Sequence, residues 1–162
     1  MKKPVFSLNT KNPVLQDLVE KTNKRNLALW ALACAERFLP YFESEFPLDP
    51  RPRKALEVLQ DWIDTGEFSM KTIRGAALSS HAAARDVGDD NPARSAARSA
   101  GQAVSTPHVK EHTLVVDNYA LQPIFRANIA GNPQDAIKAE RQWQTQRLIE
   151  LQRQASLDTH HE

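Results

Sequence analysis

The stretch HVKEH contains the residues of this chain whose types and spacing could do chemistry. On a helix, a His-x-x-Glu-His pattern places His108 and His112 one turn apart on one face, with Glu111 beside them. Such a pair can bind zinc while the glutamate activates a metal-bound water. A protease would also need a downstream carboxylate ligand, and Glu140 and Glu150 are both expected at exposed helix positions. We therefore do not expect a protease.

A second hypothesis keeps the histidines without the glutamate. His81 could join His108 and His112, because three imidazoles with an open position make a catalytic type of zinc site. The favoured interpretation is structural: Val115 and Tyr119 continue the His108 face, which is therefore expected to point inward. There the imidazoles would hydrogen-bond to a backbone carbonyl or to nearby polar side chains, namely Glu36, Gln102 and Thr106. A metal-binding helical protein or small enzyme remains the alternative.

Length and charge narrow the class of protein. A chain of 162 residues is most simply one domain and can bury roughly 70% of its unfolded surface. Its 21 basic residues nearly balance its 20 acidic residues, which argues against nucleic-acid or anionic-membrane binding as the main task. No apolar run approaches the roughly 18 residues of a membrane span, and the start lacks the apolar region of a secretory signal.

The single cysteine gives a further expectation about the compartment. Cys34 can form no internal disulfide, and its apolar neighbours in ALACAERF predict a buried, inert thiol. We therefore expect the reducing cytoplasm.

The chain is predicted to be all-α, a compact bundle of about six to seven helices. Asn12, Asn91 and Asn132 each precede a proline, and Thr106-Pro107 repeats the pattern, which is typical of a helix start. Gly66 is expected to end a helix and Pro40 to kink one near Glu36. The expected helices cover residues 13–22, 24–46, 53–65, 70–87, 92–105, 107–131 and 133–154. We expect a single helical domain over 1–162 with loosely ordered tails at 1–11 and 153–162.

One part of the chain has an unusual composition. Of the 31 residues from Gly75 to Ser105, 18 are Ala, Ser or Gly. Alanine is the best helix former, so this segment predicts a tight antiparallel helix hairpin rather than a flexible linker. Ala83 and Ala97 are expected where its two helices touch.

Two further sets of residues are interpreted from their spacing. Glu57, Asp61 and Asp64 recur at i, i+4 and i+7, which usually marks a solvated helix face and could also meet a basic partner. The three tryptophans are expected to belong mainly to the core: Trp30, Trp62 and Trp143.

Several segments in order resemble a known family. ALWALACAERFLPYFESEFPLDPRPRKALE, HAAAR, AARSAGQAVSTPHVKEH and ERQWQ are similar to the small all-α immunity proteins of bacterial polymorphic toxin systems, some of which carry a misleading exonuclease-subunit label. The resemblance covers roughly residues 26–148. Matching positions are Glu36, His81, Arg85, Gly101, Gln102, Thr106, His108 and His112. Glu111 is not among them, and Pro123 is a departure from the pattern.

The resemblance implies a cytoplasmic helical protein that binds and blocks a cognate toxin by occluding its active site. It implies no catalytic residues and no cofactor, so we expect a protein that is not an enzyme. The acidic stripe of Glu57, Asp61 and Asp64 would be a candidate toxin-binding surface. The sequence does not identify the toxin or the oligomeric state.

Overall fold

The computed structural model describes Phe6 and residues 12–108 and 121–158. Every regular element in these ranges is helical, which confirms the all-α prediction. The helices are α1 (Pro13–Lys21), α2 (Lys24–Glu45), α3 (Arg51–Thr65), α4 (Met70–Val87), α5 (Pro92–Ser105) and α7 (Pro133–Asp158). Residues 121–127 form a further helical segment before α7.

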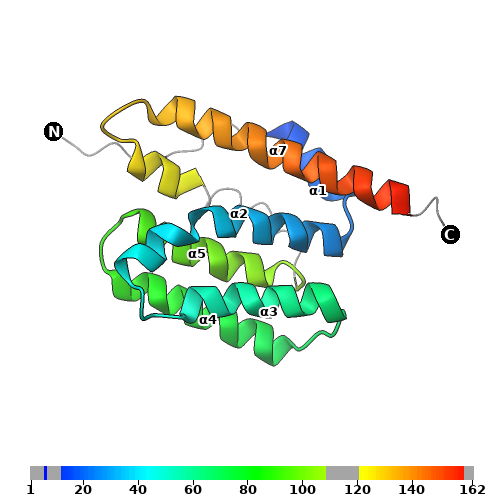
Figure 1. The fold of residues 1–162 in the computed structure, drawn as a ribbon, viewed down its shortest axis with the longest axis horizontal. Helices are drawn as coiled ribbons and strands as arrows, with labels where there is room; N and C mark the ends of the chain where they lie inside the picture. The colour runs from blue at the N-terminus through cyan, green and yellow to red at the C-terminus, as the bar shows by residue number, and fades with distance from the viewer. Residues whose placement is uncertain (1–5, 7–11, 109–120, 159–162) are drawn as a thin grey trace.

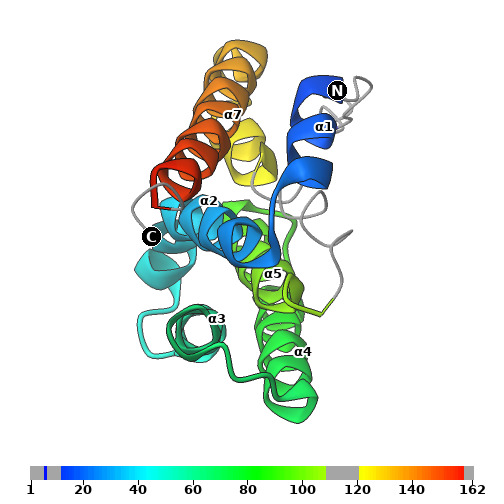
Figure 2. The ribbon, with the colours of Figure 1, turned by 90° about the vertical axis from the view of Figure 1, so that its right-hand side faces the viewer.

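The described helices lie in three tiers. Figures 1 and 2 show α1, α7 and residues 121–127 on one side, α2 and α5 in the middle, and α3 and α4 on the other side. Among the described helices, none is both long enough and apolar enough to cross a lipid bilayer.

The helix starts follow the local capping chemistry. The side chains of Asn12 and Asn91 accept hydrogen bonds from the backbone N–H of Leu15 and Arg94, at 3.2 and 3.0 Å. Asn132 accepts one from Asp135 in the same way. These contacts confirm the three Asn-Pro starts.

Of two predicted helix boundaries, the end at Gly66 is confirmed and the start at Thr106 is not. Gly66 ends α3 in the left-handed conformation at φ 67°, as predicted. Thr106 does not start a helix: its N–H donates to the Ala103 carbonyl and its backbone is right-handed helical, so it ends α5. Residues 106–108 form a turn, and the next part of the expected helix, 109–120, lies outside the described residues.

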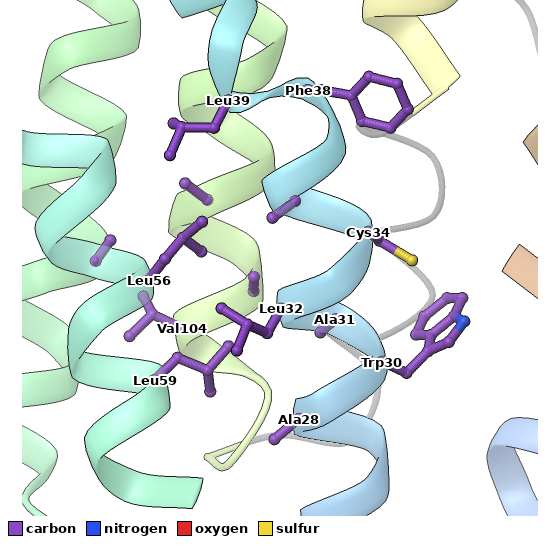
Figure 3. Packing of buried hydrophobic residues seen from close by; sticks show 14 of the residues in the cluster. Ala28, Trp30, Ala31, Leu32, Cys34, Phe38, Leu39, Leu56, Leu59 and Val104 are labelled. Atoms are coloured by element: carbon purple, nitrogen blue, oxygen red, sulfur yellow. The ribbon is translucent and has the colours of Figure 1, made fainter. Parts of the chain in front are cut away.

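The long helix α2 is the centre of the fold. It continues past Pro40, and Figure 1 shows its last turns bending away from its earlier axis. Figure 3 shows Leu32 and Leu39 pointing toward α3 and α5, and Trp30 and Cys34 pointing the opposite way. A helix that is apolar on opposite faces is buried between neighbours, and α2 packs against α5 on one side and α7 on the other.

The ends of the chain differ in part from the expected tails. Residues 153–158 form the last turns of α7, so this part of the expected loose C-terminal tail is helical. Near the other end, the ring of Phe6 packs edge-on against Phe125, with 5.4 Å between ring centroids.

Candidate functional site

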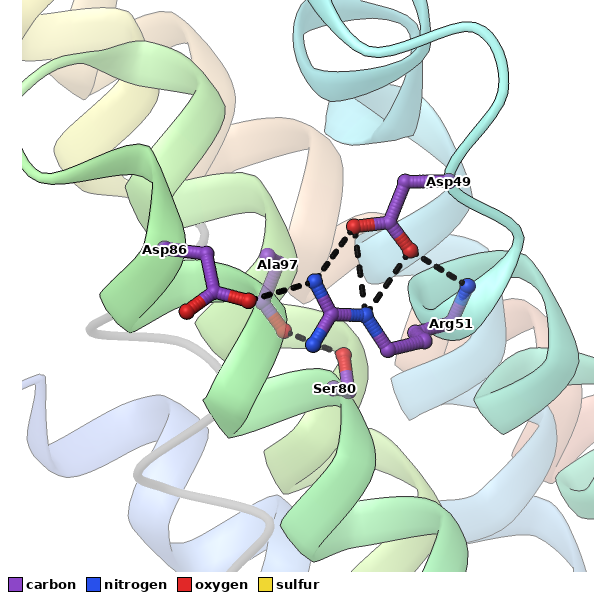
Figure 4. Close-up of polar contacts among 5 residues, drawn as sticks. All are labelled: Asp49, Arg51, Ser80, Asp86 and Ala97. Atoms are coloured by element: carbon purple, nitrogen blue, oxygen red, sulfur yellow. Dashed lines mark hydrogen bonds and ion pairs between the residues drawn. The ribbon is translucent and has the colours of Figure 1, made fainter.

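The two small-residue helices pack closely along what we call the α4–α5 seam, formed by Ser80, His81, Ala83, Ala97 and Gly101. Ala83 and Ala97 are 1% and 0% exposed, which places both in the contact as predicted. The buried Ser80 hydroxyl donates a 2.7 Å hydrogen bond to the Ala97 carbonyl (Figure 4). A side chain of one helix can reach the backbone of the other only at short separation. The structure therefore confirms the tight hairpin.

His81 is placed in this seam by the absence of a side chain at Gly101. A Cβ atom at Gly101 would lie 2.8 Å from His81 Nε2 and 2.9 Å from His81 Cε1. The half-buried imidazole thus packs against the bare Cα of the facing helix. Two of the positions that carry the family resemblance, 81 and 101, form one contact. Small-residue composition alone did not predict which polar side chain this glycine accommodates.

The other resemblance positions are spread over the fold. Glu36 on α2 and Arg85 on α4 are exposed, Gln102 on α5 is half-buried, and Thr106 is 2% exposed. From the sequence we expect Glu36 as a candidate hydrogen-bond partner of buried histidines. Its exposed side chain does not fit that role.

His108 differs from its expected position. Its side chain is exposed, and its ring lies 6.5 Å from that of the half-exposed Phe68. His108 itself therefore does not point into the bundle as expected: α5 ends at Ser105 and His108 lies in the turn beyond it. Glu111, His112, Val115 and Tyr119 lie outside the described residues. Among the residues that are described, no group of three His, Cys, Asp or Glu side chains is arranged to hold a metal ion.

A second seam was not predicted. The α2–α7 seam is formed by Trp30 and Arg37 of α2 and by Glu140, Trp143 and Gln144 of α7. Arg37 Nη2 lies 2.8 Å from Glu140 Oε2, and Arg37 Nε donates to Oε1 at 3.1 Å. The guanidinium also lies over the Trp143 ring, 3.9 Å from its centroid. Trp30 Nε1 donates a 2.8 Å hydrogen bond to the Gln144 carbonyl.

This seam corrects the expected position of Glu140. The residue is 3% exposed, whereas the sequence led us to expect an exposed helix position. Burial raises the pKa of the Glu140 carboxyl above its ordinary value, although the hydrogen bonds and charge of Arg37 act in the opposite direction. The Glu140 carboxylate forms an ion pair with Arg37 that links α7 to α2.

A third arrangement of charges fixes the loop between α2 and α3. Arg51 Nη2 contacts Asp49 Oδ2 at 2.6 Å and Asp86 Oδ2 on α4 at 2.8 Å (Figure 4). The hydrogen bonds of Arg51 hold the pKa of Asp49 below its ordinary value. These contacts tether the PLDPRP segment to α4 and leave Leu48, at 95% exposed, at the tip of the loop.

The acidic stripe lies on the outer face of α3. Glu57, Asp61 and Asp64 are all exposed, and Gln60 Nε2 donates to Asp64 Oδ1 at 2.8 Å. Beside this stripe, between α3 and the start of α4, the surface contains a groove of about 400 Å³. Trp62 and Phe68 are among its lining residues.

The segments that carry the resemblance are thus joined across helices. Arg37 of ALACAERF pairs with Glu140 of ERQWQ, and His81 of HAAAR packs on Gly101 of AARSAGQAVS. Two of the helix–helix contacts are thus made between motifs that are separate in the sequence.

Comparison with known proteins finds a match to a protein family. No curated protein and no solved structure is significantly similar to the chain. Residues 17–151, most of the chain, match the model of a family of immunity proteins. The chain belongs to the Imm-5 like putative immunity protein family.

Proposed function

We propose that this protein binds a cognate toxin and blocks the toxin's active site by covering it. The observation that carries the proposal is the family match over residues 17–151, which supports an immunity role. The place of action would be the bacterial cytoplasm, where a polymorphic toxin could harm the cell that makes it. The partner would be a protein, and the immunity protein would act on it without catalysis.

The fold supports inhibition by occlusion. Binding is tighter when a surface is already in its bound conformation, because less conformational entropy is lost on association. Helices α2, α3, α4 and α5 are held by buried side chains, and the α2–α3 loop is held by Arg51. A rigid helical surface that fits the mouth of a toxin cleft would exclude the substrate simply by its presence.

The first test is whether the protein binds and inhibits a toxin. The protein encoded by the gene next to the one for this chain would be purified, and its binding measured by isothermal titration calorimetry. Its toxicity would be measured by growth of cells that express it with and without this protein. We expect a one-to-one complex and restored growth. Absence of both would contradict the proposed function.

The stoichiometry separates occlusion from an enzymatic defence. If the protein acts by covering the active site, toxin activity should fall in proportion to the amount of complex and vanish at one equivalent. An enzyme that modified the toxin would inactivate it at a small fraction of an equivalent. Recovery of active toxin after the complex is dissociated would support occlusion, and permanent inactivation would contradict it.

A further inference from the structure

The groove between α3 and α4 has apolar walls and an open mouth. Val58, Trp62 and Phe68 are among its lining residues, and Phe68 is 50% exposed. The left-handed Gly66 reverses the chain after α3, so the segment that follows returns along the Trp62 side of that helix. Burial of an aromatic ring is favourable, and a half-exposed phenylalanine at a groove is suited to contact with a partner.

The rim of the same groove is negatively charged. Asp61 and Glu67 line the groove and are exposed, and no basic side chain is among the described lining residues. Neither carboxylate has an ion-pair partner within the described part of the chain. By contrast, Glu43 of α2 pairs with Arg53 at the start of α3, at 2.6 Å. The groove therefore combines aromatic walls with two carboxylates that form no ion pair with a described side chain.

The aromatic walls and the carboxylates together determine which kind of side chain the groove would bind best. An acidic side chain would be repelled by Asp61 and Glu67. A purely apolar side chain would displace water from those carboxylates without replacing their hydrogen bonds. A cation gains from both features, because it is attracted by the face of an aromatic ring and forms charge-assisted hydrogen bonds with carboxylates. Arginine fits better than lysine, since its planar guanidinium stacks on rings and donates to a carboxylate through two N–H groups.

We propose that this groove is part of the toxin-binding surface and that it accepts an arginine side chain of the toxin. The inference rests on the proposed function and adds to it a specific contact on α3 and α4. Glu57 and Asp64, on the same helix, would extend the negative potential around the groove. Such a field accelerates association with a basic surface and disfavours acidic partners.

The groove can be tested without the toxin. The probe is the peptide Ac-Gly-Arg-Gly-NH2, with the citrulline peptide as a matched control that is nearly the same size and uncharged. Binding is followed by nuclear magnetic resonance through the Trp62 indole N–H, with the buried Trp30 indole as an internal reference. We expect the arginine peptide to shift the Trp62 signal at millimolar concentration and the citrulline peptide to shift it at least tenfold less. Equal shifts, or no shift with arginine at about 50 mM, would overturn the assignment.

The same test with variants locates the cation. In the double variant Asp61→Asn, Glu67→Gln, the arginine-induced shift of Trp62 should be lost, because the neutral amides keep the size of the side chains and remove their charge. Glu45→Gln, an exposed carboxylate at the end of α2, is the matched control and should leave the shift unchanged. If both variants respond like the wild type, the carboxylates of the groove do not hold the peptide.

The toxin experiment distinguishes the two proposals. We expect the Asp61→Asn, Glu67→Gln variant to bind the toxin at least tenfold more weakly, and Phe68→Ala to do the same, with unchanged melting temperatures. Glu45→Gln should bind like the wild type. Wild-type affinity in both groove variants would contradict the assignment of the groove to the toxin-binding surface. The proposed function would then still stand. A wild-type protein that binds no toxin would overturn the proposed function, whatever the arginine peptide does.

Discussion

The two seams of this protein hold helices together by opposite means. In the α4–α5 seam the residues are small, and one helix touches the other through backbone atoms, as in the Ser80–Ala97 hydrogen bond and the His81–Gly101 contact. In the α2–α7 seam the side chains are large, and the ion pair between Arg37 and Glu140 joins one helix to the other. The first seam is specified by shape and the second by charge. Added volume should therefore disturb the first, and a change of charge should disturb the second.

The largest effect is expected from Arg37→Met. The substitution keeps an unbranched apolar stem and leaves the Glu140 carboxylate, whose side chain is 2% exposed, without its cation. Removing one partner of a buried ion pair commonly destabilises a protein by about 3–5 kcal/mol. Because the Arg37 side chain is 41% exposed, we expect a smaller loss of about 2–3 kcal/mol at pH 7. The measurement is the free energy of unfolding in urea.

The pH dependence of that loss identifies its cause. Since burial raises the folded-state pKa of Glu140, its contribution to stability is complete below the unfolded-state pKa of about 4.5 and is lost as pH rises through the folded-state value. Without Arg37 the folded-state pKa rises further, so the variant loses more between acidic and neutral pH. The difference between variant and wild type should therefore shrink toward pH 4. It should not depend on pH when Arg37→Met is measured in a Glu140→Gln background.

The second prediction tests the shape of the other seam. Ala97→Leu and Ala83→Leu add volume where two backbones already approach closely, and each should destabilise the fold by about 1–3 kcal/mol. Ala139→Leu, at an exposed position of α7, is the control and should stay within about 0.5 kcal/mol. Unchanged melting temperatures for both seam variants would mean that the contact between α4 and α5 is not close-packed in solution.

Alanine substitutions at two helical glycines, Gly75 and Gly101, are expected to change the stability in opposite directions. A Cβ atom at Gly75 in α4 would meet no atom of a neighbouring element within 4 Å, so Gly75→Ala should stabilise the helix by about 0.5–1 kcal/mol. Gly101→Ala gains the same helical preference but drives a methyl group into the His81 ring, and we expect a net loss of about 1 kcal/mol. His81→Ala should reverse the sign of Gly101→Ala in a double-mutant cycle. Stabilisation by Gly101→Ala in the wild-type background would contradict the packing.

The elements that sequence reasoning predicted are those fixed by local chemistry. The Asn-Pro starts depend on residues within one turn, and the hairpin depends on a run of small residues that can pack in few ways. Thr106-Pro107 failed because the Thr106 N–H continues the hydrogen bonding of α5. Glu140 was misplaced because its partner Arg37 lies 103 residues away, and nothing near Glu140 in the sequence reveals that pairing.

The candidate sites show the same division. The exposure of the acidic stripe followed from helical spacing. The groove could not be predicted from helical spacing, because it is formed only when the turn at Gly66 brings Phe68 back beside Trp62. The resemblance named the positions of His81 and Gly101, and the physical reason for them appears only when the two helices face each other.

The smallest effect on stability is expected from added metal. A metal ion bound at His81 would give the α4–α5 seam a ligand-binding role. Zinc holds imidazole nitrogens at roughly 2.0–2.1 Å, so its ligands must converge. His81 packs on Gly101, whereas His108 lies exposed beside Phe68, more than a helical turn further along the chain; His112 is outside the described residues. We therefore expect neither about 100 μM zinc nor EDTA to move the midpoint of unfolding. A site with a Kd of about 1 μM would instead add about 2.7 kcal/mol at that zinc concentration. Stoichiometric zinc in the purified protein that disappears in His108→Ala would contradict this expectation, because the imidazoles would then be ligands rather than parts of the seam and the surface.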